Sequence, residues 1–212
     1  GENIGDNSTN NVLIGYRCAK ASTGLDKFVG DNNTYIGYQC GLVNTLGSDN
    51  VAIGTNCLDS NTTGNQNVAI GKECLQENIS GTSNVAMGYQ CLYSNTVNDN
   101  TAIGYKCAFY NENGTQNVAI GYKCLEGSSS NYTGTNNNVA IGYQCGQFIG
   151  SSATNNVLIG YECAKAKSNI YDDSTGGTQT SYTNNNQIYI VHTFLSSGTF
   201  TLPTDTICDY LI

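Results

Sequence analysis

The sequence repeats one short pattern of apolar and polar positions, as in residues 67–75, Asn-Val-Ala-Ile-Gly-Lys-Glu-Cys-Leu. The pattern occurs nine times with a cysteine, and a glycine stands three residues before each of these cysteines. The cysteines are Cys18, Cys40, Cys57, Cys74, Cys91, Cys107, Cys124, Cys145 and Cys163, so subtraction gives spacings of 22, 17, 17, 17, 16, 17, 21 and 18. A constant motif with a period near 17 predicts a solenoid, in which each repeat buries its apolar side chains by stacking on the next.

Alternation within the motif predicts one short strand per repeat. Val or Thr follows the asparagine, Ala usually comes next, and then Ile, or Met at position 87. Side chains alternate along a strand, so Val and Ile share one face and Ala lies on the other. Both faces are apolar, so we expect a strand buried on both sides. We also expect the glycine to make the bend after it.

The asparagine suits the corner before the strand, because it tolerates left-handed backbone and forms local hydrogen bonds. Stacked asparagines can also bond side chain to side chain along the solenoid. We therefore expect ladders of equivalent residues. They are represented by Asn67, Ile70, Gly71, Cys74, Asn84, Gly88, Cys91, Asn117, Ile120, Gly121 and Cys124.

A polar residue always stands directly before the cysteine, and we expect it to face water. Its two neighbours, usually a tyrosine and always a cysteine, should then point inward. The tyrosines are Tyr16, Tyr38, Tyr89, Tyr105, Tyr122, Tyr143 and Tyr161. We expect mostly reduced, buried thiols, with pairing between rungs or chains as the alternative. Stacked tyrosines could bind sugars, but rings packed in the core or between chains are the favoured interpretation.

The composition narrows the possible partners. The 212 residues carry a net charge of −8 with only 8 Lys and Arg, so a nucleic-acid partner is not expected. No apolar run reaches the length of a membrane-spanning helix. The abundant Asn, Thr, Ser and Gly would also suit disorder, but the regular Val-Ala-Ile core favours a folded repeat. The chain begins at Gly1 and stops within a strand-like stretch, so we expect a fragment of a longer protein.

The period divides the chain into three parts. Residues 1–165 form the repeat shaft, with longer excursions at 21–31 and 126–137. Residues 166–186 are polar and read as a linker, and residues 187–212 read as a truncated C-terminal β-hairpin module. Within that module we expect strands at 187–194 and 198–203, joined by a Ser-Ser-Gly turn.

The block Asn-Val-Ala-Ile-Gly-Tyr at 117–122 and 138–143 resembles the head repeats of YadA-like trimeric autotransporter adhesins. It is also similar to repeats of phage and giant-virus fibres, which often carry a turn like Asn-Thr-Thr-Gly at 61–64. The resemblance covers roughly residues 1–165 and implies a parallel β-roll whose three copies pack around a common axis. The longer repeat and the cysteine differ from the bacterial heads, so a viral fibre is the favoured interpretation. The C-terminal module resembles those before the glycine-rich tips of such fibres.

Candidate catalytic groups are few. His192 is the only histidine, and we expect it to be structural. A serine or cysteine triad that uses another histidine is therefore impossible within one chain. Asp172 with Asp173, or Asp26 with Asp31, could supply paired carboxylates, but solvated turns are the favoured interpretation. No motif indicates a cofactor, and zinc would need thiolates from separate rungs or chains. We expect no enzyme activity, no cofactor and no metal.

Asparagine sequons provide the remaining candidate sites. They occur at Asn7, Asn32, Asn61, Asn78, Asn113 and Asn131. Several of them fall in expected turns, although such matches arise by chance in a chain so rich in Asn and Thr.

These features predict an all-β, parallel β-solenoid of about nine rungs that acts as the non-enzymatic shaft of a viral fibre. It would lie on the virion surface, outside cells, and support attachment to a host glycan or receptor. A homotrimer is expected through the small third position, which is Ala52, Ala69, Ala86, Ala102, Ala119 and Ala140. The alternatives are a bacterial trimeric surface adhesin head and a glycan depolymerase of the tailspike type.

Overall fold

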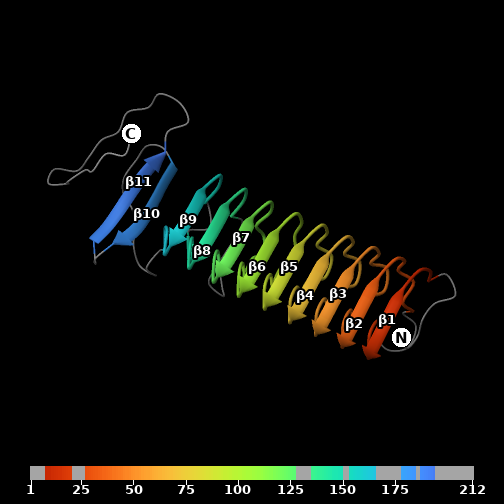
Figure 1. Cartoon of the computed structure of the whole chain (residues 1–212). Coiled ribbons are helices and arrows are strands. Elements are labelled where there is room, and N and C mark those ends of the chain that lie inside the picture. Colours follow the sequence, from red (N-terminus) through yellow and green to blue (C-terminus); the bar gives the residue numbers. More distant parts are fainter. Residues whose placement is uncertain are drawn as a thin grey trace.

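The computed structural model describes residues 8–20, 27–127, 135–149, 153–165, 178–184 and 187–193. Every regular element in these ranges is a β-strand, and nine strands form one sheet in chain order (Figure 1). They are β1 (Val12–Tyr16), β2 (Thr34–Tyr38), β3 (Val51–Thr55), β4 (Val68–Lys72), β5 (Val85–Tyr89), β6 (Thr101–Tyr105), β7 (Val118–Tyr122), β8 (Val139–Tyr143) and β9 (Val157–Tyr161). The chain therefore climbs through a row of stacked rungs, each carrying one strand.

Neighbouring strands are parallel and pair without a register shift. Val51 lies opposite Val68 and Gly54 opposite Gly71, and equivalent positions pair in the same way from β1 to β9. The longer first connection does not disturb this register, since β1 and β2 still pair position by position. The nine parallel strands, spaced at about 17 residues, confirm the expected β-solenoid.

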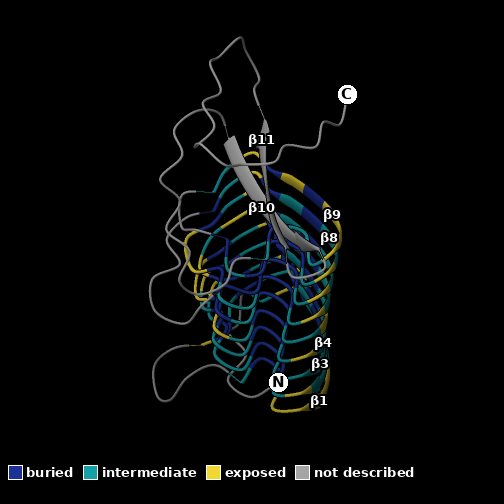
Figure 2. Ribbon diagram, turned by 90° about the vertical axis from the view of Figure 1, so that its left-hand side faces the viewer, coloured by how far each residue is buried: buried dark blue, intermediate teal, exposed yellow. Residues whose placement is uncertain are grey.

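The interior of the coil is narrow and holds small side chains. The third-position alanines, such as Ala69 and Ala119, are fully buried with the cysteines and with Leu58 and Leu75. Val and Ile alternate with alanine and so lie on the opposite, outer face of the sheet, where neighbouring rungs half-bury them. The half-buried residues of the strands are teal in Figure 2. The prediction that the alanines face a partner chain is therefore wrong. Alanine lies inside because each rung must also accommodate asparagines, a cysteine and, in several rungs, a leucine.

The glycine of each repeat lies within the strand, so the prediction that it makes the bend is wrong. In β4, Gly71 is followed by a further strand residue, Lys72. Gly71 has a φ of 127°, and an added Cβ would lie 1.8 Å from the carbonyl oxygen of Gly88 in the next rung. Glycine is needed here because two backbones approach each other with no space for a side chain.

The bends are made instead by three residues per rung with left-handed backbone. Around β4 these are Gln66, Glu73 and Leu75, with φ values of 57°, 59° and 51°. The chain therefore turns around the cysteine, directly after the strand. The polar residue before the cysteine was expected to face water, but in this position only Arg17 is exposed and the others are half-buried. They bond along the stack instead, as when Gln90 Nε2 donates to Glu73 Oε2 at 2.6 Å.

A separate two-stranded antiparallel sheet follows the solenoid in sequence. β10 (Thr178–Asn184) pairs with β11 (Gln187–Thr193), with Thr178 opposite Thr193. The prediction that residues 166–186 are all linker is therefore wrong, because 178–184 form a strand. The sequence Thr-Gln-Thr-Ser-Tyr-Thr-Asn lacks the apolar alternation that marks a strand, which explains the error. The second expected strand, 198–203, lies outside the described residues.

Candidate functional site: the interior ladders and the outer face

The corner asparagines form a continuous buried ladder along the axis. The side-chain oxygen of each accepts a hydrogen bond from the backbone N–H of the next, as in Asn50 to Asn33 at 2.9 Å and Asn67 to Asn50 at 2.9 Å. The side-chain amide donates across the rung to a turn carbonyl, as from Asn67 to Gly81 at 2.8 Å. The predicted asparagine ladder is therefore confirmed. From Asn11 to Asn138, each member closes its corner because its side-chain oxygen accepts from the next rung and its side-chain amide donates to a turn carbonyl.

A second asparagine ladder runs through the closing turns, and sequence reasoning missed it. Its members, Asn44, Asn61, Asn78, Asn95 and Asn111, are all buried. The Asn78 side-chain amide donates to Asn61 Oδ1 at 3.0 Å and to Gly81 O at 3.1 Å. The available signal was the repeated Asn-x-x-Gly spacing, as at 61–64 and 78–81.

This second ladder overturns two of the candidate glycosylation sites. Asn61 and Asn78 lie in sequons, but both side chains are fully buried and hydrogen-bonded to neighbouring rungs. A glycan cannot be attached at these two positions in the folded chain. Asn32 and Asn113 are exposed, and the Asn32 amide donates to Asp49 Oδ1 at 3.1 Å. Asn7 and Asn131 lie outside the described residues.

The cysteines form a third interior ladder. Eight of the nine are buried, Cys163 in the last rung is partly exposed, and all nine are free. Each thiol between β1 and β9 lies near two carbonyl groups, as Cys91 Sγ lies 3.3 Å from Met87 O and 3.2 Å from Gly104 O. Burial raises the pKa of the Cys18 thiol and raises that of Cys145 to about 11. The nine thiols are thus unpaired, as expected, and burial keeps Cys18 and Cys145 protonated near neutral pH.

The tyrosines lie on the outer face, so the expectation that they point inward is wrong. Tyr105, Tyr122 and Tyr143 are each a little more than one-third exposed. Their rings stack, with centroids 5.0 Å apart and nearly parallel planes. The stack starts at Tyr89 and ends at Tyr161, and a shorter stack joins Tyr16 and Tyr38. Because neighbouring rings cover one another's faces, the stack presents ring edges and hydroxyl groups, which disfavours sugar binding on its ring faces.

Lysines accompany the aromatic side chains on this part of the coil. Lys72 Nζ lies 5.7 Å from the Tyr89 ring centroid, and Lys106 Nζ lies 4.9 Å from that of Phe109. The alkyl stems can therefore cover ring surface while the ammonium groups stay near water. The outer face is thus a stripe of Val, Ile and Tyr in which Lys72 takes the tyrosine position of β4.

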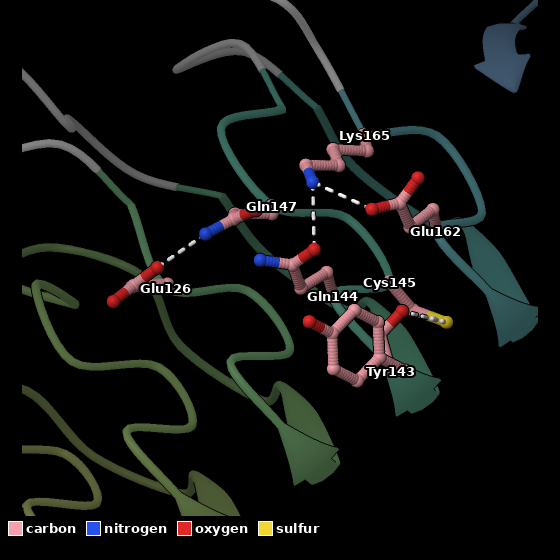
Figure 3. A network of polar contacts seen from close by, with 7 residues as sticks. All are labelled: Glu126, Tyr143, Gln144, Cys145, Gln147, Glu162 and Lys165. Atoms are coloured by element: carbon pink, nitrogen blue, oxygen red, sulfur yellow. Dashed lines mark hydrogen bonds and ion pairs between the residues drawn. The ribbon is translucent and has the colours of Figure 1, made fainter. Parts of the chain in front are cut away.

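A polar cluster links the last rungs (Figure 3). Lys165 Nζ donates to Gln144 Oε1 at 2.6 Å and pairs with Glu162 Oε1 at 2.7 Å. The amide of Gln147 donates to the Glu126 carboxylate, and both of these side chains are buried. Each contact joins residues of the same rung or neighbouring rungs, so the cluster ties the rungs together. It does not assemble a catalytic group set.

Of the four candidate carboxylates, only Asp31 lies among the described residues. Asp31 Oδ1 accepts from the backbone N–H and the hydroxyl of Thr9, at 2.7 and 2.9 Å. Asp26, Asp172 and Asp173 lie outside the described residues. His192 lies in β11 opposite Gln179. In the part of the chain that the structure describes, no group of three His, Cys, Asp or Glu residues is placed to hold a metal ion.

Across the described ranges, no helix is both long enough and apolar enough to cross a membrane. No protein-family model, no curated protein and no solved structure matches this chain.

Proposed function

We propose that this chain is a structural shaft segment of a viral surface fibre, which holds a host-binding part away from the virion. The observation that supports this proposal is the unbroken register of nine rungs with three buried ladders along their axis. Such a coil is long, stiff and uniform, which suits a spacer. The viral assignment rests on the resemblance of the Asn-Val-Ala-Ile-Gly-Tyr repeats to those of viral fibres.

The same proposal includes lateral association into a homotrimer through the outer face of the sheet. Val68 and Ile70, and their equivalents from β2 to β8, form a stripe that neighbouring rungs only half-bury, and it is apolar except for Thr34 in β2 and Thr101 in β6. Large contiguous apolar patches are uncommon on monomeric proteins and mark interaction surfaces. Three stripes facing a common axis would cover this surface.

Lateral association can be tested by changing the stripe and measuring the mass. Light scattering extrapolated to low protein concentration should give three times the 22.5 kDa of one chain for the unaltered protein. Ile70→Lys combined with Ile120→Lys should lower the mass to one chain, because charges at a closing apolar interface are costly to bury. Thr63→Lys with Gln116→Lys, at exposed turn positions, is the matched control and should remain trimeric. A single-chain mass for the unaltered protein would contradict the trimer.

The shaft role needs a separate measurement. Antibodies against the folded chain should label filaments projecting from virions in electron micrographs, along the filament rather than at its tip. Labelling of a bacterial surface instead would favour the adhesin alternative. Release of sugars from a host polysaccharide by the purified chain would favour the depolymerase.

A further inference from the structure

The first and last rungs have almost the same sequence. Residues 9–21 and 154–166 are identical except that Arg17 in the first rung corresponds to Glu162 in the last. Both rungs carry the strand Val-Leu-Ile-Gly-Tyr, whereas most inner rungs have alanine in place of the leucine. The two ends of the array therefore match in backbone pattern and carry opposite charges at one position.

Both end strands are exposed. On β1, Ile14 and Tyr16 are 56% and 57% exposed, and on β9, Ile159 and Tyr161 are 63% and 73% exposed. Solenoids usually protect their ends with polar capping repeats, because an open strand edge can pair with another chain. Neither end strand has such a polar outer face.

The ladders stop with complementary groups at the two ends. In every rung before the last, the asparagine Oδ1 accepts from the next asparagine N–H, as Asn11 in the first rung does from Asn33 at 2.8 Å. At the other end Asn156 N–H donates to Asn138 Oδ1 at 3.0 Å. Among the described residues nothing donates to Asn156 Oδ1 and nothing accepts from Asn11 N–H. One end of the array thus offers an acceptor where the other offers a donor.

The cysteine ladder is polarised in the same direction. Cys145 Sγ lies within hydrogen-bond distance of Gly160 O in the next rung, at 2.7 Å. Within the described ranges, Cys163 Sγ lies within hydrogen-bond distance of just one carbonyl, that of Ile159 in its own rung, at 3.0 Å. A rung placed on β9 would supply the missing glycine carbonyl, and in the first rung that residue is Gly15.

We propose that β9 of one chain binds β1 of a second copy in parallel register, so that the solenoids join end to end. Asn11 N–H of the second copy would donate to Asn156 Oδ1, and Cys163 would donate to the Gly15 carbonyl. Arg17 would lie next to Glu162, in the ladder position where Gln90 already reaches Glu73 at 2.6 Å. A head-to-tail contact of this kind does not close on itself and gives filaments. This axial contact is independent of the lateral trimer, which uses the outer face.

Charge reversal at the junction tests this contact on the full chain of 212 residues. Sedimentation velocity and electron microscopy should show rods whose length grows with protein concentration. Arg17→Glu alone, or Glu162→Arg alone, should raise the dissociation constant of the axial contact roughly tenfold, because like charges then meet at the junction. The double variant, Arg17→Glu with Glu162→Arg, should restore growth. Lys106→Gln, at the same ladder position in the middle of the array, is the control and should grow like the unaltered protein.

The outcomes separate this proposal from the lateral one. Growth in length by the Ile70→Lys and Ile120→Lys variant would support axial joining even where the trimer is lost. A constant rod length for the unaltered protein across the micromolar range would overturn the end-to-end contact. A double variant that grows no better than the single variants would overturn the assigned register of Arg17 against Glu162.

Discussion

Tyr35 fills the space that a side chain at Gly41 would need. A Cβ added to Gly41 would lie 2.4 Å from Cε2 of Tyr35. Tyr35 is fully buried, accepts from the Asn44 amide at 2.9 Å and donates to Asn33 Oδ1 at 3.2 Å. The next rung has Ala52 and Leu58 at these two positions. One rung therefore has its large side chain at the first position, and the next rung has it at the second. The volume filled inside the coil stays similar.

Exchanging the pair should reproduce the ordinary rung. Tyr35→Ala alone should lower the free energy of unfolding by about 3–5 kcal/mol, because it leaves a cavity and removes a partner of Asn44. Adding Gly41→Leu should recover most of this loss, since Leu58 has a φ of 51°, close to the 57° of Gly41. Urea denaturation of the three proteins measures the effect. Gly41→Leu alone should be strongly destabilising, and a tolerated single variant would contradict the shared volume.

The in-strand glycines should be intolerant of any side chain. Gly88→Ala would place a Cβ 1.9 Å from the Gly104 carbonyl oxygen at a φ of 126°. The rungs must move apart there, so we expect a loss of more than about 3 kcal/mol. Thr63→Ala, in an exposed turn, is the control and should change the stability by less than about 0.5 kcal/mol. Circular dichroism during urea titration compares them, and similar midpoints would contradict the close backbone approach.

Two sequon asparagines should respond differently to the same change. Asn78→Ala removes the donor to Asn61 Oδ1 and Gly81 O inside the coil, and should cost about 1–3 kcal/mol. Asn113→Ala changes an exposed turn and should cost less than about 0.5 kcal/mol. Mass spectrometry after expression in a glycosylating host should show Asn78 unmodified. A glycan found on Asn78 of folded protein would refute its burial.

Alkaline pH should weaken the fold through the buried thiols. Burial raises the pKa of Cys145 from 9.0 to about 11, so the folded state keeps a proton that the unfolded state releases. The unfolded chain binds fewer protons in this window, so stability is fully present below about pH 9 and falls as pH rises toward 11. Thermal unfolding of the unaltered protein and of Cys145→Ala, at pH 8 and at about pH 11, measures the difference. The variant should show a smaller alkaline loss, and an equal loss would contradict this role for Cys145.

Replacing a cysteine distinguishes a packing role from a covalent one. Cys91→Ala should leave the fold intact at a cost of roughly 1 kcal/mol, and Cys91→Asp should not fold because it buries a charge. Among the nine described cysteines, thiol counting should find little reaction in the folded protein and full reaction after denaturation, with the partly exposed Cys163 reacting first. Fewer than half of the thiols free after denaturation would indicate disulfides.

The sequence predicted the rungs correctly because Gly71 and Cys74 recur at fixed spacing, and a fixed spacing defines a register. It predicted which residues share a face, but not which face is inside. A period of two groups Val68 with Ile70 whether that pair is buried or not, and both faces are apolar. The pattern therefore did not predict that alanine lies inside while Val and Ile lie outside. The width of the coil decides which face is inside. That width depends on how far the closing turn extends from the strand, and the pattern within one strand does not contain this information.

The second asparagine ladder shows a different limit. Asn61 and Asn78 occur in turn-like, polar stretches, where asparagine normally faces water. Their burial depends on a hydrogen-bond partner in the next rung, about 17 residues away, and on the left-handed corners on either side. Aligning the turn sequences of all rungs with one another shows the repeated Asn-x-x-Gly, which is not apparent along a single turn.

The constant register across unequal connections has a practical consequence. Val12 and Thr34 are paired although five more residues separate them than separate Val51 and Val68. The pairing between two rungs therefore does not depend on the number of residues that connect them. Foreign peptides inserted between rungs 1 and 2 should be carried as side arms while the rod is preserved. The solenoid could thus serve as a display scaffold, on which epitopes or enzyme tags are mounted at chosen heights.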